Sequence, residues 1–275
     1  MNSYLDLVKE YAEKHKRKNR MSLFVILLAV ALVATIFGMA DMELQTQQIS
    51  MKKQYGSWHI GIKDMAKEQE QIVALRPQIA VSGYLESVGS RSGYTLFGKA
   101  ANILGVDEAL AKELGIRLEA GTWPDKGNEA LITGTMARTF GIEPGDSITL
   151  ERPDGDAMQL LITAVAGDTA SILKADQAGI LMSVETLRRL FSPEEYSSAY
   201  YIKFRPFTNI QAEKLKIAES LGITPDSIGE NAYLLAAMGQ SDDPFFVGIY
   251  GTAAVLFLFV LTAAVLMITS SFQTS

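Results

Sequence analysis

The stretch MSLFVILLAVALVATIFGMADMELQTQQISMKKQY, residues 21–55, decides the fold, because it predicts one helix with two different environments. Its first part, Met21–Ala40, contains no Asp, Glu, Lys or Arg. About 20 helical residues are enough to cross the hydrocarbon core of a bilayer. A buried core helix is the alternative, but core helices of this length usually keep a polar face. We therefore predict a transmembrane helix over residues 21–40.

The same stretch carries no signal that would end the helix at the membrane surface. Residues 41–55 contain neither Gly nor Pro, and the next glycine is Gly56. Met42 and Ile49 stand seven residues apart, so they lie on one side of a continued helix. We predict that the helix continues as a stalk over residues 41–55, with a partner helix along its thin apolar stripe.

A second uncharged stretch, Phe245–Ile268, lies close to the end of the sequence. Its length also suffices to cross a bilayer as a helix. We predict a second transmembrane helix over residues 242–270. Residues 56–241 then form a domain inserted between the two transmembrane helices.

The charges beside the first span predict its orientation. Basic residues close to a span stay in the cytoplasm, and five of them precede it, whereas Asp41 and Glu43 follow it: Lys14, Lys16, Arg17, Lys18 and Arg20. The N-terminus is therefore expected in the cytoplasm, and residues 41–244 outside the cell membrane. A cleaved signal peptide is the alternative, because GMA before Asp41 resembles a cleavage site. The basic segment in front is long for such a peptide.

Residues 1–20 predict a short basic helix on the cytoplasmic side. The segment NSYLDLVKEYAEKHKRKNR spaces its apolar residues as one helical face and places Lys and Glu on the other. Such a helix suits the inner surface of the membrane. Packing against another part of a protein is the alternative.

Charge and cysteine content argue against some functions of the region between the spans. The chain has a net charge of −6, residues 1–20 hold 6 basic and 3 acidic residues, and the stretches 21–40 and 245–275 hold none, which leaves residues 41–244 between them. The region between them therefore carries 19 basic and 28 acidic residues, a net charge of −9. This acidic balance argues against nucleic acid as a partner. The chain has no cysteine, which excludes thiol catalysis and disulfides.

Alternating segments with strand and helix signals predict an α+β domain over residues 56–241. Asp154-Gly155 is a hairpin turn signal between two of the strands. The expected strands are 56–62, 78–88, 93–99, 129–133, 147–151, 159–165, 178–183 and 198–204, and the expected helices are 63–75, 106–116, 135–140, 184–191 and 209–221.

The domain shows no catalytic equipment. No glycine-rich phosphate-binding loop is present, and TGTMAR lacks the Lys that such a loop needs. His59 is the single histidine between the spans, so neither a serine triad nor a metal site has enough ligands. We expect no catalytic, cofactor-binding or metal-binding residues and no enzyme activity, and the sequence identifies no ligand-binding residues.

Several weak motifs in a fixed order resemble the FtsX-like permease family with a MacB-type outer domain. They follow the basic N-terminus and first span: YGSWHIGI, ANILGVDE, LEAGTWPDKGNEALIT, FGIEPGDSITL, LLITAVAG and the closing ITSSFQTS. The resemblance extends over essentially the whole chain.

This resemblance implies a membrane subunit of an ABC transporter whose ATP hydrolysis takes place in a separate ATPase subunit. Such subunits are thought to work by mechanotransmission, in which the stalk carries motion to the outer domain. Their substrates are of peptide, antibiotic or lipid type, or their partners lie in the cell envelope. The implied partners are the ATPase, the lipid bilayer, and a second permease half or a second copy of the chain. Residues 271–275 would begin a cytoplasmic coupling segment, so we expect the sequence to be a truncated N-terminal half.

A sensory receptor is the alternative. Chemoreceptors and sensor kinases share the basic N-terminus, the two spans and an outer domain of this size. In that case long cytoplasmic signalling helices, rather than a coupling segment, would follow Ser275.

Overall fold

The chain forms two compact units. The helical unit comprises residues 1–47 and 242–275, and the sheet unit comprises residues 48–241. The computed structural model describes residues 16–89, 91–168, 178–241 and 244–273. The helix expected at residues 1–20 therefore falls outside the described residues over most of its length.

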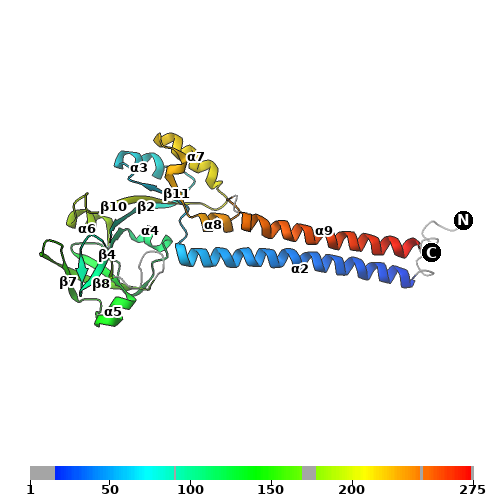
Figure 1. The fold of residues 1–275 in the computed structure, drawn as a ribbon, viewed down its shortest axis with the longest axis horizontal. Helices are drawn as coiled ribbons and strands as arrows, with labels where there is room; N and C mark the ends of the chain where they lie inside the picture. The colour runs from blue at the N-terminus through cyan, green and yellow to red at the C-terminus, as the bar shows by residue number, and fades with distance from the viewer. Residues whose placement is uncertain (1–15, 90, 169–177, 242–243, 274–275) are drawn as a thin grey trace. The chain divides into compact units, whose positions relative to one another are not determined.

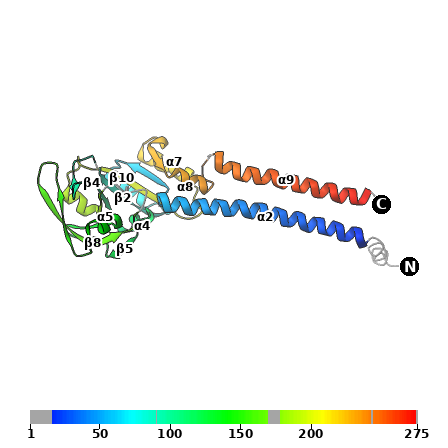
Figure 2. The ribbon, with the colours of Figure 1, turned by 60° about the horizontal axis from the view of Figure 1, so that its bottom comes forward.

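Two long helices make up the helical unit. Helix α2 covers Lys16–Tyr55, of which residues 16–47 belong to this unit, and helix α9 covers Pro244–Gln273. They run side by side in opposite directions (Figures 1 and 2), and Phe37 meets Phe257 edge-on with ring centroids 6.0 Å apart. Most large apolar side chains of both helices remain exposed to their surroundings.

Helix α2 has the properties of a membrane span. Its segment Leu23–Tyr55 reaches a mean hydropathy of 2.8 over an 18-residue window, and only 11% of that window is buried. Among the described residues it is the one helix that is long and apolar enough to cross a membrane. In α9 the corresponding apolar segment is the shorter Gly251–Met267.

The sheet unit is a mixed α+β structure (Figure 1). Its strands are β1 (Ile60–Lys63), β2 (Ile79–Val88), β3 (Thr95–Leu96), β4 (Lys99–Val106), β5 (Leu118–Gly121), β6 (Glu129–Thr133), β7 (Ser147–Glu151), β8 (Ala157–Ala166), β9 (Ala178–Met182), β10 (Ser197–Phe204) and β11 (Ile228–Glu230). Its helices are α3 (Lys67–Ala74), α4 (Glu108–Glu113), α5 (Gly134–Phe140), α6 (Val184–Leu190), α7 (Ile210–Leu221) and α8 (Ala232–Ala237), with a 3₁₀ turn at Pro225–Ser227.

Six of the strands close into a ring. The pairings run β4-β3-β7-β8-β6-β9, and β9 then pairs in parallel with β4. Strand β5 pairs with the end of β8 beyond the part that β7 contacts, and Figure 2 shows β5 beside β8. One apolar cluster draws buried residues from all six strands. Closure leaves these strands without a free edge, which protects them against pairing with another chain.

Strand β4 joins the ring to the rest of the sheet. Besides β3 and β9 it pairs with β2, and the order continues β2-β10-β1-β11 with antiparallel pairs throughout. Ala101 and Ile103 on β4 face the core of the ring. Leu104 and Val106 point to the other face, where they pack in the cluster that includes α4. Successive residues of a strand point to opposite faces, so β4 is buried on both.

A further core lies under α3 and α7. It combines residues of β1, β2 and β10 with residues of both helices, and its largest fully buried members are Tyr200 and Phe204. Asn209 caps α7 through a hydrogen bond from the Ala212 N–H to its side chain, and Gly222 ends the helix in the left-handed conformation.

Most expected elements of the domain are present, with one correction. The predicted strand at residues 93–99 is wrong, because Phe97 and Gly98 have positive φ values of 52° and 71° and form a turn. The short β3 ends before this turn, and β4 begins after it. Strands β4, β5 and β11 and helix α8 were not expected from the pattern. The hairpin expected at Asp154-Gly155 is confirmed, since it joins β7 to β8.

An ion pair between buried Glu86 and the more exposed Arg188 holds α6 against β2. The Glu86 side chain is 1% exposed, and its Oε1 accepts hydrogen bonds from Arg188 Nε at 2.7 Å and Nη2 at 2.6 Å. Burial raises the pKa of the Glu86 carboxyl above its usual range, against the opposing effect of Arg188. The guanidinium also lies 4.7 Å from the centroid of the Tyr84 ring. Removing Arg188 would therefore leave the buried Glu86 carboxylate without a counter-charge and lower the stability of the fold.

Replacing Arg188 with Met should lower the free energy of unfolding of the sheet unit by about 2 kcal/mol, because Glu86 then stays buried without its counter-charge. Denaturant unfolding of the full chain, followed by tryptophan fluorescence, measures this. The double variant Glu86→Gln/Arg188→Met should be more stable than Arg188→Met alone. The exposed Lys112→Met serves as the control, and an equal effect of Arg188→Met and Lys112→Met would contradict the prediction.

Candidate functional site

The backbone after α2 turns sharply at Gly56. Its φ is +85°, a value that L side chains rarely adopt, and its N–H donates to the Lys52 carbonyl at 3.0 Å. A Cβ at this position would lie 2.7 Å from the Glu113 carbonyl oxygen and 2.9 Å from the Leu114 Cα. Both the dihedral angle and the close approach require glycine. The end of α2 is thereby set directly against the end of α4.

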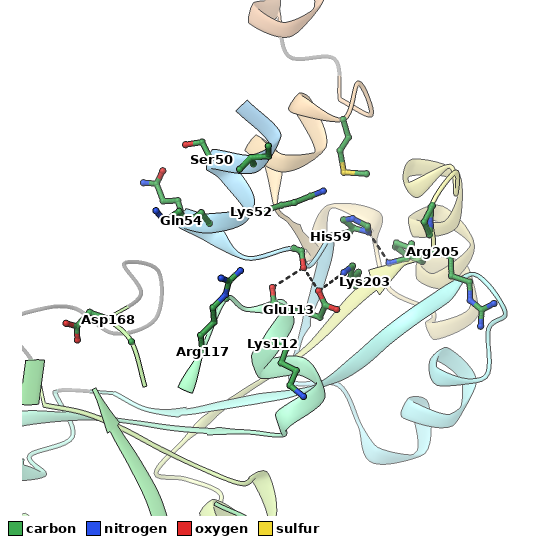
Figure 3. A pocket seen from close by; sticks show the side chains of 18 of the residues that line it. Ser50, Lys52, Gln54, His59, Lys112, Glu113, Arg117, Asp168, Lys203 and Arg205 are labelled. Carbon is green, nitrogen blue, oxygen red and sulfur yellow. Dashed lines mark hydrogen bonds and ion pairs between the residues drawn. The ribbon is translucent and has the colours of Figure 1, made fainter. Parts of the chain in front are cut away.

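Ser57 and Lys203 both bind the Glu113 side chain. The Ser57 hydroxyl donates to Glu113 Oε2, and Lys203 Nζ donates to the same oxygen at 2.5 Å (Figure 3). Burial alone would raise the pKa of the Glu113 carboxyl, but the hydrogen bonds from Lys203 and Ser57 outweigh it and lower the pKa. The carboxylate stays charged at neutral pH and links α4 to β10 and to the segment after α2.

The N-terminus of α8 holds the same segment from another direction. Buried Asn231 donates through Nδ2 to the carbonyls of Gly56 at 3.2 Å and Trp58 at 3.1 Å. Its backbone N–H donates to the His59 carbonyl at 3.0 Å. The side chain and backbone of Asn231 therefore bind the carbonyls of three of the first four residues after α2.

Helix α8 also contacts the last turns of α2 directly. Gln48 Nε2 donates to the Ala237 carbonyl at 2.7 Å. The rings of Tyr55 and Tyr233 stack with centroids 5.4 Å apart and planes 19° apart. We call this set the α2 junction, and it consists of Gln48, Tyr55, Gly56, Ser57, Trp58, Glu113, Lys203, Asn231, Tyr233 and Ala237.

His59 is buried at the base of the junction and has a structural role. Its Nδ1 accepts a hydrogen bond from the Phe204 N–H at 3.0 Å, and its ring stacks on that of Phe204. Burial, followed by the positive charges of Lys203 and Lys52, lowers the pKa of His59 from 6.5 to about 4. The imidazole is therefore neutral at pH 7.

A pocket of about 1270 Å³ opens between the last turns of α2 and the sheet (Figure 3). Helix α2 contributes Ile49, Ser50, Lys52, Lys53 and Gln54 to its wall. The opposite wall comes from the end of α4, the segment around Arg117, Asp168, and the end of β10. A shift of the α2 turns relative to the sheet would change the shape of this pocket.

The far rim of the pocket has its own charge network. Asp168 accepts hydrogen bonds from the Thr135 hydroxyl at 2.6 Å and from Arg138 Nη2 at 2.8 Å. Burial acts to raise the pKa of the Asp168 carboxyl, but these bonds prevail and lower it. Arg138 also pairs with Glu119 at 3.6 Å.

The polar side chains of Ser57 and His59 are both engaged within the protein. Ser57 and His59 line one pocket, yet the Ser57 hydroxyl donates to Glu113, and His59 Nδ1 is occupied by a backbone N–H. Within the part of the chain that the structure describes, no group of three His, Cys, Asp or Glu residues is placed to hold a metal ion. An imidazole with a pKa of about 4 is a weak base at neutral pH.

Sequence reasoning did not identify the residues of the junction. The sequence marks Gly56 as the end of a helix and His59 as a lone histidine. No local sequence pattern marks Glu113, Lys203 or Asn231 as functional residues. Their partners lie 56 to 175 positions away along the chain. A glycine directly after a long helix without breakers was the one signal that pointed here.

Comparisons with known proteins agree with this fold. The family model of the MacB-like periplasmic core domain matches residues 21–219, more than half of the chain. No curated protein matches the sequence. The similar solved structures include a domain of a putative permease protein from Porphyromonas gingivalis, with 15% identity and a TM-score of 0.42 over 61% of this chain and 82% of that one.

Two further structures are similar at lower identity. The periplasmic region of MacB from Actinobacillus actinomycetemcomitans has 10% identity and a TM-score of 0.47, and covers 67% of this chain and 94% of that one. The extracellular domain of the noncanonic ABC-type transporter YknZ from Gram-positive bacteria has 9% identity and a TM-score of 0.42, and covers 62% and 98%. The assignment of a family rests on the family model.

Replacing Gly56 with Ala should destabilise the sheet unit by about 3 kcal/mol, because strained φ and a backbone clash act together. Gly98→Ala is the matched control, since Gly98 also has a positive φ but open space around its Cβ position. It should cost only about 1 kcal/mol of backbone strain. Denaturant midpoints of the two variants measure the difference, and equal midpoints would show that the close approach to Glu113 is unimportant.

The stability of the sheet unit should fall as the pH drops from about 7 to about 4. His59 has a pKa of about 4 in the folded chain and about 6.5 when unfolded, so the unfolded chain binds more protons in this range. The loss amounts to about 3 kcal/mol. His59→Asn keeps an acceptor for Phe204 but does not titrate. Its unfolding free energy should depend less on pH, and parallel curves for both proteins would contradict this account.

Proposed function

The chain belongs to the MacB-like periplasmic core domain family, and from this premise we propose that it is the membrane subunit of an ABC transporter that works by mechanotransmission. The family match confirms the resemblance drawn from the sequence motifs. In this proposal ATP hydrolysis takes place in a separate ABC-type ATPase. The chain itself acts with a second permease half or with a second copy of itself.

The continuity of α2 carries the proposal. One uninterrupted helix, Lys16–Tyr55, contains the apolar segment and ends in the turns that the sheet unit binds at the α2 junction. A helix is stiff along its axis because every turn is hydrogen-bonded to the next. A displacement of its membrane segment would therefore be transmitted to the α2 junction, because no flexible linker lies between them to absorb it.

The membrane arrangement follows from the same helix. We infer that α2 crosses the cell membrane over residues 21–40, that residues 41–55 form a stalk, and that residues 242–270 cross back. The exposed apolar faces of α2 and α9 would then contact lipid. The basic residues before the first span keep the N-terminus in the cytoplasm, so residues 41–244 lie outside, with the MacB-like domain at 56–241. We also infer that residues 271–275 belong to a cytoplasmic coupling segment.

The junction would turn motion of α2 into motion of the sheet unit. The backbone of Gly56 is in close contact with the end of α4, so there is no flexible segment between α2 and α4. Asn231 hydrogen-bonds Gly56 and Trp58 and so links them to the N-terminus of α8. A pull or tilt of the helix would act on α4, α8 and β10 together. Substrates of peptide, antibiotic or lipid type, or partners in the cell envelope, would be moved by the sheet unit and need not pass between the spans.

Replacing Gln47 and Gln48 with two glycines should uncouple the sheet unit from the membrane segment. Each glycine costs about 1 kcal/mol of helix stability and introduces a flexible point, and the Gln48–Ala237 hydrogen bond is also lost. A single fluorophore on an introduced Gln54→Cys reports on the junction, because the chain has no other cysteine.

In the complex with its ATPase, ATP should change the fluorescence of this reporter in the parent chain but not in the Gly-Gly variant. Gln47→Ala/Gln48→Ala is the control, since it removes the same side chains and keeps the helix. Its response should survive. A normal ATP response in the Gly-Gly variant would refute transmission through α2, and absence of any ATP response in the parent would refute coupling to an ATPase.

A further inference from the structure

The pocket beside α2 is basic, although the region between the spans is acidic. Its lining has six basic residues and three acidic ones: Lys52, Lys53, Lys112, Arg117, Lys203 and Arg205, against Glu113, Glu119 and Asp168. The region as a whole carries a net charge of −9. Cations gathered in a concave site raise the local concentration of anions.

The three acidic residues of the lining are already engaged. Glu113 binds Ser57 and Lys203, and both Glu119 and Asp168 pair with Arg138. Lys203 compensates Glu113, and Arg138 compensates one of the two charges of Glu119 and Asp168. One negative charge of the lining therefore remains, which the other cations of the pocket outnumber.

Some of the basic side chains of the lining form ion pairs or hydrogen bonds within the protein, and others form none among the described residues. Lys112 pairs with Glu108 at 2.8 Å, and Arg205 Nε donates to the Ile79 carbonyl at 3.3 Å. Among the described residues, no ion pair or hydrogen bond engages the side chains of Lys52, Lys53 or Arg117.

Two of these free cations face the pocket from opposite walls. Figure 3 shows Lys52 on the last turns of α2 and Arg117 on the segment after α4, with the Arg117 side chain directed toward α2. The charges of Lys203 and Lys52 are both felt at His59, where they help to lower its pKa. The positive field therefore extends to the base of the pocket.

The dipole of α2 explains only part of this arrangement. Lys52 and Lys53 stand in the last turn of the helix, where cations are favourable. Arg117 lies outside any helix and gains nothing from that effect. A free arginine across the pocket from a free lysine fits a bound carboxylate or phosphate, which a guanidinium can contact with two N–H groups.

The rest of the lining adds an apolar part. Ile49, Phe204, Pro206 and Met238 contribute to the wall between α2 and the end of β10. The volume of about 1270 Å³ exceeds the usual range of roughly 300–1,000 Å³ for small-molecule pockets. A ligand that fills it needs an apolar body as well as an acidic group.

We propose that this pocket binds an anionic amphiphile. Its carboxylate or phosphate lies between Lys52 and Arg117, and its apolar body packs on Ile49, Pro206 and Met238. The ligand then touches α2 and the sheet at once, so its affinity and the position of α2 are linked reciprocally. This site goes beyond the proposed transport function and is tested without an ATPase, so either can fail alone.

Binding is measured on the full chain in nanodiscs of phosphatidylcholine, by energy transfer from tryptophan to a dansyl probe. Both tryptophans, Trp58 and Trp123, belong to the sheet unit, so the signal reports probe near that unit rather than probe in lipid. Dansyl-glycine supplies a carboxylate and dansyl-aminoethyl phosphate supplies a phosphate. Dansylamide is the neutral probe of the same apolar body.

Both anionic probes should bind at least about tenfold more tightly than dansylamide, and added salt should weaken them. Lys52→Gln and Arg117→Gln should each lower the affinity roughly tenfold. Arg117→Lys should lower it less, because the ammonium keeps the charge but not the two parallel N–H contacts. Lys112→Gln is the matched control at the rim and should leave the affinity unchanged. All three positions are exposed at the surface, so folding should not be affected.

Tighter binding of the carboxylate probe would indicate a carboxylate ligand, and tighter binding of the phosphate probe would indicate a phosphate headgroup. Either result supports the site. Equal affinity for the neutral probe, or an unchanged affinity in both Lys52→Gln and Arg117→Gln, would overturn it.

Discussion

The contact between Gly56 and the end of α4 is the constraint on which the rest of the molecule depends. Because the backbone of Gly56 approaches the Glu113 carbonyl closely, α2 can end in only one place relative to the sheet. Ser57 then reaches the Glu113 carboxylate, and Asn231 reaches the carbonyls on either side of it. Strand β1 follows this turn and pairs with β10 and β11. The turn at Gly56 therefore sets where the end of α2 lies relative to these strands.

The same contact creates the electrostatic character of the pocket. Glu113 remains ionised because Lys203 and Ser57 bind it, whereas burial and neighbouring lysines keep His59 neutral. The internal charges are thus paired, and the cations left over line the wall that α2 shares with the sheet. The dipole of α2 accounts for Lys52 and Lys53 but not for Arg117 on the opposite wall, and a bound anion would compensate this surplus of positive charge.

Local sequence patterns predicted most of the elements and failed where pairing was decided at a distance. The hairpin at Asp154-Gly155 and the helix that ends at Gly222 depend on the conformations of single residues, so both could be anticipated. Strand β4 was missed, because a strand buried on both faces shows no alternation of apolar and polar residues. The pattern predicts one strand at 93–99, because phenylalanine is common in strands and rarely adopts the positive φ that Phe97 has.

The sequence by itself determined the long apolar helix, the α+β class of the domain and the family. These follow from hydropathy, from periodicity and from motifs that are read along the chain. Only the tertiary structure decided that β4 closes a ring of strands, that Glu113, Lys203 and Asn231 meet at the end of α2, and that free cations gather beside it. Such contacts join residues up to 175 positions apart, and their energies depend on burial and close approach, which no local pattern records.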